Sequence, residues 1–321
     1  MKKYNFIFML FAILMFMSCG LDEDIFVMRA NAGLGFVVTN ADDWKKALKI
    51  IESGDRNDHN AKNYIITVKG DMPLSGNSIH FPNNRTITIN GKGRLYLTSK
   101  GSMFDIGSFS TIIIDSADLI FEGLTNSQNG VSSDNEYPLI SVQSGTLKLQ
   151  NGTIRNNTCI ASGADRAVGG GVQIYAGGAF IMTGGTISGN TVSARPGYSN
   201  SFHGGGVSVN KGSFTMTGGT ISGNKANNGN GGGVYISGDA WSTPKTSFTM
   251  SGGTISGNSA KYGGGVSISQ GTFTKSGGGI IYGENAPAAD KNTAATRGNA
   301  VYWDGGSRDT TLGESDNFNT N

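Results

Sequence analysis

One heptapeptide recurs unchanged along this chain, and its spacing limits the folds that the chain can adopt. Gly-Gly-Thr-Ile-Ser-Gly-Asn occupies residues 184–190, 218–224 and 252–258, and degenerate copies stand at residues 151–157 and 277–285. A second motif, Gly-Gly-Gly-Val-x-Ile or Gly-Gly-Gly-Val-x-Val, begins four times, at Gly169, Gly204, Gly231 and Gly263. Repeats of about 20 to 50 residues indicate a solenoid, in which each unit buries its apolar face against the next.

The shortest cycle predicts the secondary structure of one coil. Residues 253–278 hold three short runs of alternating apolar and polar residues, separated by glycine-rich turns. Alternation of this kind predicts strands, so one coil should contain three of them. Longer cycles, of 33 or 34 residues, add residues at two fixed places. We therefore expect loops between each repeated Asn and the following glycine triplet, lined up along one edge at residues 158–168, 191–203, 225–230, 259–262 and 286–298.

Stacking of the coils assigns structural roles to the repeated side chains. One inward column should contain eight residues, which are Ile79, Phe104, Ile140, Val172, Val207, Val234, Val266 and Val301. Ile187, Ile221 and Ile255 should form a second aliphatic column. Asn190, Asn224 and Asn258 should superpose at one turn, where each amide can bond the copies above and below. The glycines permit positive φ and close approach of the backbone. With 51 Gly but only 6 Pro, the chain does not have the composition of collagen.

Both ends of the chain differ from the repeats. Residues 1–19 are typical of an export signal that ends in a sequence resembling a bacterial lipobox, which predicts lipidation of Cys19; the alternative is an ordinary cleaved signal. Residues 20–39 are expected to be a tether, and residues 40–53 a helix whose Trp44, Leu48 and Ile51 cap the solenoid. Residues 304–321 are expected to be a polar tail. With Cys19 lipidated, Cys159 is the only thiol left, so no intramolecular disulfide is expected.

The two motifs resemble the repeats of right-handed parallel β-helix proteins of the pectin-lyase-like superfamily, over roughly residues 60–303. Gly-Gly-Gly-Val-x-Ile with Thr-Ile-Ser-Gly-Asn is more particularly similar to bacterial surface proteins of the polymorphic outer-membrane protein type. The resemblance implies an all-β fold, a single-stranded right-handed parallel β-helix with three-strand coils and about eight rungs. It implies no single activity, because the superfamily includes lyases, hydrolases, tailspikes and adhesins.

Acidic residues are too sparse in the regular repeats for the paired carboxylates of a glycoside hydrolase. Between Arg166 and Gly283 the only one is Asp239. The three histidines, at positions 59, 80 and 203, lack metal-ligand spacing, so we expect exposed polar residues there and neither a metal nor a cofactor. A catalytic alternative remains upstream, where the acidic residues are Asp105, Asp115, Asp118, Glu122, Asp134 and Glu136. Solvated turns are the other interpretation of these carboxylates.

Basic and aromatic residues gather instead in the segments expected to form the edge loops. The candidate binding residues there are Arg166, Arg195, Tyr198, Phe202, Lys225, Lys261 and Tyr262, and Trp241 stands in a second insertion. Such residues can contact an anionic glycan or a protein through charge and ring stacking, or they can simply keep a neutral solenoid soluble. Without residues 1–19 the chain has 23 basic and 23 acidic residues, so its bulk charge does not favour nucleic acid.

The sequence therefore predicts a non-catalytic, lipid-anchored protein of a bacterial envelope, at the outer membrane or the cell surface. Its β-helix face would bind a glycan or a host protein, as in an adhesin, and only the N-terminal lipid would contact the membrane. Two alternatives remain open. The first is a polysaccharide lyase or glycoside hydrolase of the pectin-lyase-like fold, and the second is a structural envelope protein.

Overall fold

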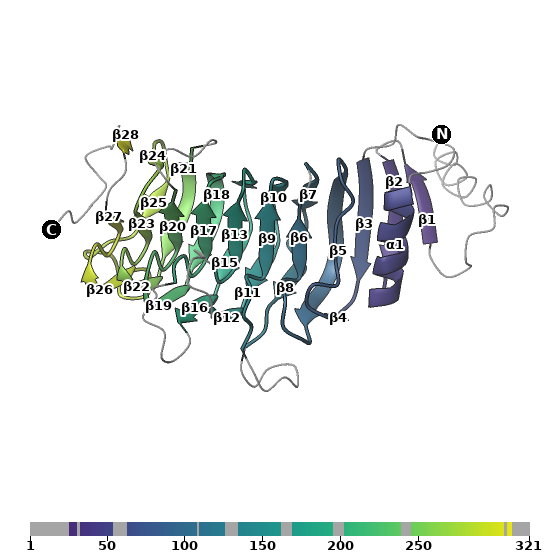
Figure 1. The fold of residues 1–321 in the computed structure, drawn as a ribbon, viewed down its shortest axis with the longest axis horizontal. Helices are drawn as coiled ribbons and strands as arrows, with labels where there is room; N and C mark the ends of the chain where they lie inside the picture. Colours follow the sequence, from purple (N-terminus) through teal and green to yellow (C-terminus); the bar gives the residue numbers. More distant parts are fainter. Residues whose placement is uncertain are drawn as a thin grey trace, which may run out of the picture.

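The computed structural model describes residues 26–30, 33–53, 63–107, 109–125, 134–161, 169–194, 202–238, 245–304 and 307–309. In these residues the fold is all-β, with one helix and three sheets in which nearly all strand pairs are parallel. The strands stand side by side along the molecule, from β1 (Phe26–Ala30) at the amino-terminal end to β27 (Val301–Trp303) towards the other (Figure 1). This arrangement is consistent with a parallel β-helix.

The seven-stranded sheet carries the predicted inward column. Its strands are β6 (Phe104–Ile106), β9 (Ile140–Gln143), β13 (Val172–Tyr175), β17 (Val207–Asn210), β20 (Val234–Ser237), β23 (Val266–Ile268) and β27 (Val301–Trp303). The first residue of each strand pairs with the first residue of the next, from Phe104 to Val301. Ile79 extends the column, because its neighbour His80 forms a parallel bridge with Asp105. All eight column residues are buried, as predicted.

The sixteen-stranded sheet forms two further walls. Its strands are β1 (Phe26–Ala30), β2 (Gly33–Val38), β3 (Asn63–Lys69), β4 (Met72–Leu74), β5 (Thr86–Leu97), β7 (Thr111–Ile114), β8 (Leu119–Glu122), β10 (Thr146–Leu149), β11 (Thr153–Arg155), β14 (Ala179–Met182), β15 (Thr186–Ser188), β18 (Ser213–Ser222), β21 (Ser247–Ser256), β24 (Thr272–Lys275), β25 (Ile280–Ile281) and β28 (Ser307–Asp309). Three long strands, β5, β18 and β21, run through both walls and join them into one sheet.

Side chains from these walls meet in one continuous core. Ile187, Ile221 and Ile255 lie in register and are fully buried, which confirms the predicted aliphatic column. Phenylalanine rings form a parallel stack in which Phe214 lies 4.8 Å from Phe180 and 4.6 Å from Phe248, measured between ring centroids. The stacked rings come from residues that are far apart in the sequence. Each ring adds dispersion contacts between neighbouring coils, so the stack stabilises the array as a whole.

The asparagines form the predicted ladder, and it is longer than the repeats indicate. Asn224 Nδ2 donates to Asn258 Oδ1 (3.0 Å) and to the Ile187 carbonyl (2.9 Å), while its Oδ1 accepts from the amide and from Nδ2 of Asn190 (3.0 Å each). The same pattern continues beyond the three predicted members to Asn292, which is fully buried; Asn285, at the end of the last degenerate copy of the motif, does not take this position. Asn285 is exposed, because the last coil places extra residues before its ladder position.

The glycine triplets allow neighbouring coils to approach closely. Positive φ is confined to the first glycine in three of them, for example 67° at Gly231. A Cβ on the second glycine, Gly232, would lie 2.5 Å from the carbonyl oxygen of Gly264 in the next coil. The amide of Gly232 donates to the carbonyl of Gly263 (3.1 Å), so the two backbones run in direct contact there. The triplets therefore provide both positive φ and close approach of the backbone, which are the two predicted roles of glycine.

The ends of the array correct two predicted boundaries. Strands β1 and β2 lie inside the predicted tether of residues 20–39, and β2 pairs with β3 in parallel register. At the other end, β28 pairs with β24 beyond the predicted limit at residue 303. Backbone pairing thus continues past the strongest repeats, since a ladder hydrogen bond needs no particular side chain.

The amino-terminal helix has the predicted cap and buried face. Helix α1 (Ala41–Ser53) lies at the amino-terminal end of the strands (Figure 1). Asn40 Oδ1 accepts from the amides of Asp42 and Asp43 (2.9 Å each), which satisfies two of the free donors of the first turn. Trp44 is fully buried and stacks on Phe104, with 5.7 Å between the ring centroids. No helix in the described ranges has the length and hydropathy to cross a membrane.

Candidate functional site

The edge expected to consist of loops contains a parallel sheet of five strands. Its strands are β12 (Thr158–Ala161), β16 (Thr191–Ala194), β19 (Lys225–Asn230), β22 (Ser259–Tyr262) and β26 (Thr293–Arg297). Small apolar residues point inward in register, from Cys159 and Val192 to Ala226 and Ala260. The predicted coil of three strands thus has a fourth strand here. Burial raises the pKa of the Cys159 thiol far above its usual range, so it is an unreactive core residue.

Two of the predicted binding residues are exposed on the outer face of this sheet. Lys225 begins β19 and pairs with Ser259, and Lys261 lies two positions further along β22. Side chains two residues apart on a strand share a face, so both ammonium groups point away from Ala226 and Ala260. Four predicted binding residues, Arg166, Arg195, Tyr198 and Trp241, and the predicted lipidation site Cys19 lie outside the described residues.

Three further residues, Tyr262, Arg297 and Tyr302, complete this cluster at the carboxyl-terminal end. Tyr262 is half-buried and stacks on Tyr302, with 4.9 Å between the ring centroids, and Lys261 Nζ lies 5.2 Å from the centroid of Tyr262. Arg297 pairs in register with Tyr262 and is exposed. Burial, followed by the charge of Asp304, raises the pKa of Tyr302. We call Lys225, Lys261, Tyr262, Arg297 and Tyr302 the basic–aromatic edge.

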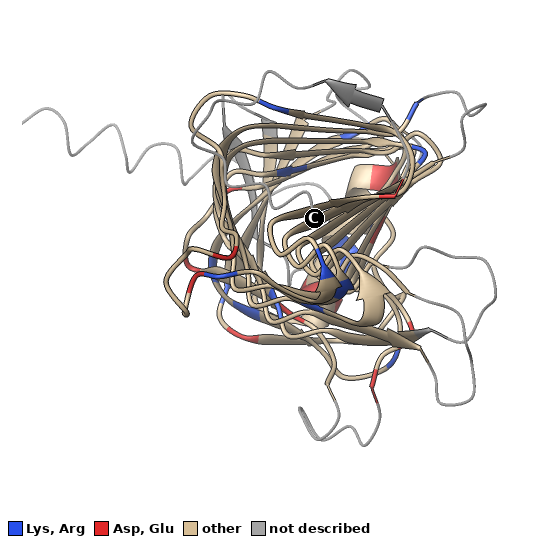
Figure 2. Cartoon of the chain, turned by 90° about the vertical axis from the view of Figure 1, so that its left-hand side faces the viewer, with Lys and Arg blue, Asp and Glu red and all other residues tan. Residues whose placement is uncertain are grey.

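Charged residues make up only 15% of the chain. Seen along the stack, the strands form a closed outline on which Lys, Arg, Asp and Glu occupy few positions (Figure 2). Lys291, near the edge in sequence, forms an ion pair with Glu284. Three cations presented on one sheet beside a stacked tyrosine pair therefore distinguish the basic–aromatic edge from its surroundings.

Phe202 does not belong to the binding surface that the sequence predicts. It is only 2% exposed and packs in the small cluster of Cys159, Val192, Ala226 and Ala260. Its carbonyl lies so close to Gly229 that a Cβ there would come within 1.7 Å of the oxygen. Phe202 is therefore a core residue of the five-stranded sheet, which the prediction missed because it treated the segment as a loop.

His203 also differs from the predicted exposed polar residue. Its ring stacks on Tyr235 with 4.2 Å between the ring centroids, and its Nδ1 accepts from the amide of Asn230 (3.0 Å). Burial lowers the pKa of His203 to about 4. Protonation would both charge a desolvated ring and remove the acceptor for the Asn230 amide, so the folded state favours neutral imidazole.

The lowered pKa of His203 predicts that the free energy of unfolding depends on pH above the pH range in which carboxyl groups titrate. In the unfolded chain the His203 imidazole gains a proton near pH 6.5, whereas in the folded chain it stays neutral down to about pH 4. The free energy of unfolding therefore falls as the pH decreases between these two values. We expect a loss of about 1 to 2 kcal/mol between pH 7 and pH 5. Urea denaturation of His203→Gln should show a flatter dependence of the free energy of unfolding on pH than that of the wild type. Equal slopes for wild type and His203→Gln would contradict the assignment.

The upstream carboxylates lie in different environments. Burial alone would raise the pKa of Glu122, but hydrogen bonds from Asn156 and Arg94 and the charge of Arg155 hold it below its usual value. Arg94 Nη1 lies 2.8 Å from Glu122 Oε2.

Asp115 and Asp118 are exposed, and Asp115 accepts from Asn151 of the next coil (2.8 Å). Glu136 pairs with Lys100 (2.7 Å), and Asp134 is half-buried. These contacts account for Glu122, Asp115 and Glu136 as structural groups.

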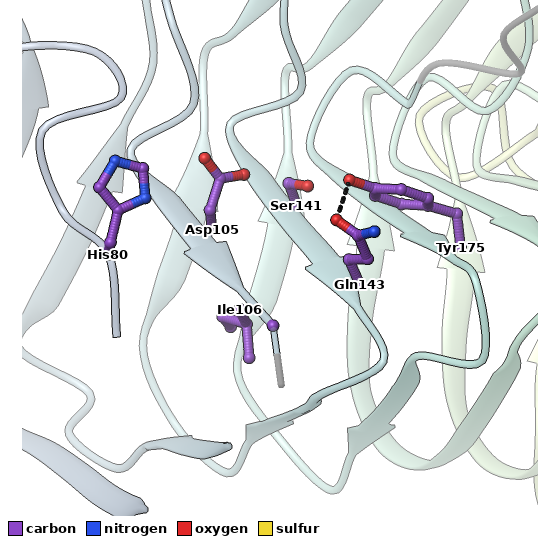
Figure 3. A pocket seen from close by; sticks show the side chains of 7 residues that line it. His80, Asp105, Ile106, Ser141, Gln143 and Tyr175 are labelled. Atoms are coloured by element: carbon purple, nitrogen blue, oxygen red, sulfur yellow. Dashed lines mark hydrogen bonds between the residues drawn. The ribbon is translucent and has the colours of Figure 1, made fainter. Parts of the chain in front are cut away.

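Asp105 lies in a different setting, on the outer face of the seven-stranded sheet. It lines a shallow hollow of about 280 Å³ together with His80, Ser141, Gln143 and Tyr175. Figure 3 shows these side chains pointing to the same side of successive strands. Tyr175 Oη donates to Gln143 Oε1 (2.9 Å), which fixes the orientation of both groups. From the sequence, only Asp105 is a candidate site residue and His80 is expected to be an exposed polar residue, although His80, Asp105 and Ser141 each directly follow a residue of the inward column.

This face is open at the amino-terminal coils and covered further along the stack. The corresponding outer residues Ser208 and Ser267 are fully buried, and Tyr235 is 5% exposed beneath His203. The glycine turns lie against this face, as shown by a Cβ on Gly263 that would come within 2.7 Å of Ser267 Cβ. Since the five-stranded sheet begins only at β12, His80, Asp105 and Gln143 stay accessible.

Within the described ranges, no three His, Cys, Asp or Glu side chains are grouped so that they could hold a metal ion. Comparisons with protein-family models, curated proteins and solved structures gave no match for this chain.

Proposed function

We propose that this protein is a non-catalytic binding protein whose basic–aromatic edge holds an anionic glycan. The observation that carries the proposal is the presentation of Lys225, Lys261 and Arg297 on one sheet, beside the stacked rings of Tyr262 and Tyr302. Exposed cations attract carboxylate or sulfate groups, and an aromatic face supports the C–H face of a sugar ring. The parallel strands hold these groups in place, so binding requires little ordering of the side chains.

The finer fold assignment is part of this proposal. A right-handed parallel β-helix of about eight coils, of the pectin-lyase-like type, is supported by the general preference of crossovers between parallel strands for the right hand. The sequence supports lipidation at Cys19 and a position on the outer membrane or cell surface, where a glycan-binding edge would meet its ligand. A carbohydrate-active enzyme and a structural envelope protein remain the alternatives, and the same experiment separates all three.

Substitution of the three edge cations tests the proposal. The full chain should bind polygalacturonate and chondroitin sulfate but not neutral dextran, with affinity that falls as salt increases. The combined variant Lys225→Ser, Lys261→Ser and Arg297→Ser should bind at least about tenfold more weakly, because it removes three local charges. Calorimetric titration would measure the dissociation constants.

A matched variant controls for net charge. Lys49→Ser, Lys69→Ser and Lys92→Ser removes three exposed cations at the amino-terminal end, so it should keep the wild-type affinity. Equal weakening by both variants would show a non-specific charge effect and contradict the edge assignment. Release of shortened oligosaccharides would favour the enzyme, and binding of neither polymer would favour the structural protein.

A further inference from the structure

The hollow on the seven-stranded sheet has a chemistry unlike that of the basic–aromatic edge. It combines the imidazole of His80, the carboxylate of Asp105, the hydroxyl of Ser141, the amide of Gln143 and the phenol of Tyr175. Together these groups offer several hydrogen-bond donors and acceptors, and the carboxylate of Asp105 supplies a negative charge. Such a mixture matches the hydroxyl groups of an uncharged sugar, whereas a phosphate, sulfate or uronate would be repelled by Asp105.

Position and size also suit a single sugar ring. The hollow spans neighbouring coils, because Asp105 pairs with Ser141 and Gln143 pairs with Tyr175. Its volume of about 280 Å³ is slightly below the range of roughly 300 to 1,000 Å³ that encloses drug-sized ligands. The Tyr175–Gln143 hydrogen bond and the strand backbone hold the lining groups in place, so binding requires little rearrangement.

An exposed aromatic residue beside the hollow has no role in packing. Phe109 follows the lining residue Gly107 by two positions, and its amide donates to the carbonyl of Ser144, the neighbour of Gln143 (3.3 Å). Phe109 is 77% exposed and has a φ of 62°, a conformation that is unfavourable for a bulky residue. The corresponding corners of later coils use Ser144, Ala176 and Lys211, also at positive φ. The corner therefore requires the conformation but not the phenyl ring.

We propose that the hollow formed by His80, Asp105, Ser141, Gln143 and Tyr175 binds one uncharged hexose unit, with Phe109 as an aromatic contact at its rim. The hydroxyl groups of the sugar would exchange hydrogen bonds with the lining side chains, and a C–H face would lie against an exposed ring. This site is separate from the basic–aromatic edge, and it selects for an uncharged sugar, whereas the edge is proposed to hold an anionic glycan. Strain at Phe109 is consistent with a functional residue, because such strain concentrates at binding sites.

Ligand-observed NMR titration of the full chain tests this site. The probes are D-galactose, D-glucose and N-acetyl-D-glucosamine, with D-galacturonate as the anionic counterpart. At least one neutral sugar should bind saturably with a dissociation constant in the millimolar range, and D-galacturonate should bind at least about fivefold more weakly. Asp105→Asn should remove most of this difference. Absence of saturable binding by all three neutral sugars at about 50 mM would overturn the proposal.

Phe109→Ser places the residue of the next coil at the strained corner and should weaken sugar binding about tenfold. Phe109→Gly should weaken binding similarly and raise the thermal midpoint, since glycine accepts positive φ without a steric cost. A thermal midpoint at or above the wild-type value would show that the variant is folded, so weaker binding could not be attributed to misfolding. Tyr137→Ser removes an exposed ring elsewhere and should leave binding unchanged. Wild-type affinity in both Phe109 variants would overturn the rim contact. The combined variant Lys225→Ser, Lys261→Ser and Arg297→Ser should still bind the neutral sugar. Failure of the hollow as a site can therefore be distinguished from failure of the basic–aromatic edge.

Discussion

Asn224→Ala should destabilise the protein by about 4 kcal/mol or more, one of the largest effects of any single substitution in the chain. The side chain of Asn224 is fully buried, and its amide makes four hydrogen bonds to two asparagines and one backbone carbonyl. Truncation leaves the amide and Nδ2 of Asn190, Oδ1 of Asn258 and the Ile187 carbonyl without this partner. Each buried polar group that loses its partner costs about 1 to 3 kcal/mol.

Urea denaturation followed by circular dichroism would measure this loss as a lower midpoint. Asn285→Ala is the matched control, because Asn285 stands in a degenerate copy of the motif but is exposed. It should change the free energy of unfolding by less than about 0.5 kcal/mol. Asn292→Ala should behave like Asn224→Ala, since Asn292 accepts from the amide and Nδ2 of Asn258 (2.9 Å each). A small effect at Asn224, or a large effect at Asn285, would contradict the ladder.

Gly232→Ala should destabilise the protein by at least about 3 kcal/mol, although it adds only one methyl group. The new Cβ would lie 2.5 Å from the carbonyl oxygens of Gly264 and Ser259 and 2.6 Å from the amide nitrogen of Ser259. All three atoms belong to the backbone of the neighbouring coil, so no side-chain rotation relieves the contact. Separation of the coils would also stretch the hydrogen bond from the Gly232 amide to the Gly263 carbonyl.

Gly278→Ala provides the control for glycine content itself. A Cβ at Gly278 meets no atom within 4 Å, and its φ is not in the positive region. Its substitution should be neutral or slightly stabilising, because alanine lowers the conformational entropy of the unfolded chain. Thermal unfolding of the two variants would separate close backbone approach from a general effect of losing glycine. Similar midpoints for Gly232→Ala and Gly278→Ala would contradict the close approach.

Identical repeats made the centre of the fold predictable. Asn190, Asn224 and Asn258 recur at equal spacing, so strict superposition followed from the sequence alone. The sequence does not predict Asn292, because it stands seven positions after Asn285, where the last degenerate copy of the motif ends. The motif spacing is broken there, but the backbone register of the coil is kept. Pairing in a parallel sheet depends on backbone groups, and a repeat search detects only side-chain identity.

The five-stranded sheet was not predictable by the same reasoning. Its strands contain Ala, Ser, Lys and Asn, which have weak strand propensity, and segments of different length follow them. Stacking of equivalent positions overrides these propensities, because each strand between β12 and β26 gains ladder hydrogen bonds from two neighbouring strands. As a result, the sequence predicts loop residues at Phe202 and His203, although Phe202 packs in a core and His203 stacks on Tyr235.

The two candidate sites differ in how much of them the sequence revealed. Lys225, Lys261 and Tyr262 were recognisable as non-repeated residues at one corner, but Tyr302 required the stacked geometry. The hollow combines single residues from weakly repeated coils, so no motif marks it. Its signal was the alternation itself, since His80, Asp105 and Ser141 each follow a buried residue of the inward column. Repeated residues thus account for the fold, and non-repeated outward residues form the candidate sites.

The central claim is that the protein binds glycans and does not cleave them. Its most direct test is a binding measurement on the full chain with polygalacturonate and chondroitin sulfate, in which bound polymer and released oligosaccharide are determined in the same samples. We expect saturable, salt-sensitive binding that the substitutions at Lys225, Lys261 and Arg297 weaken at least about tenfold, with polymer length unchanged. Shortening of either polymer by the wild-type chain, or undiminished binding by the edge variant, would contradict the account.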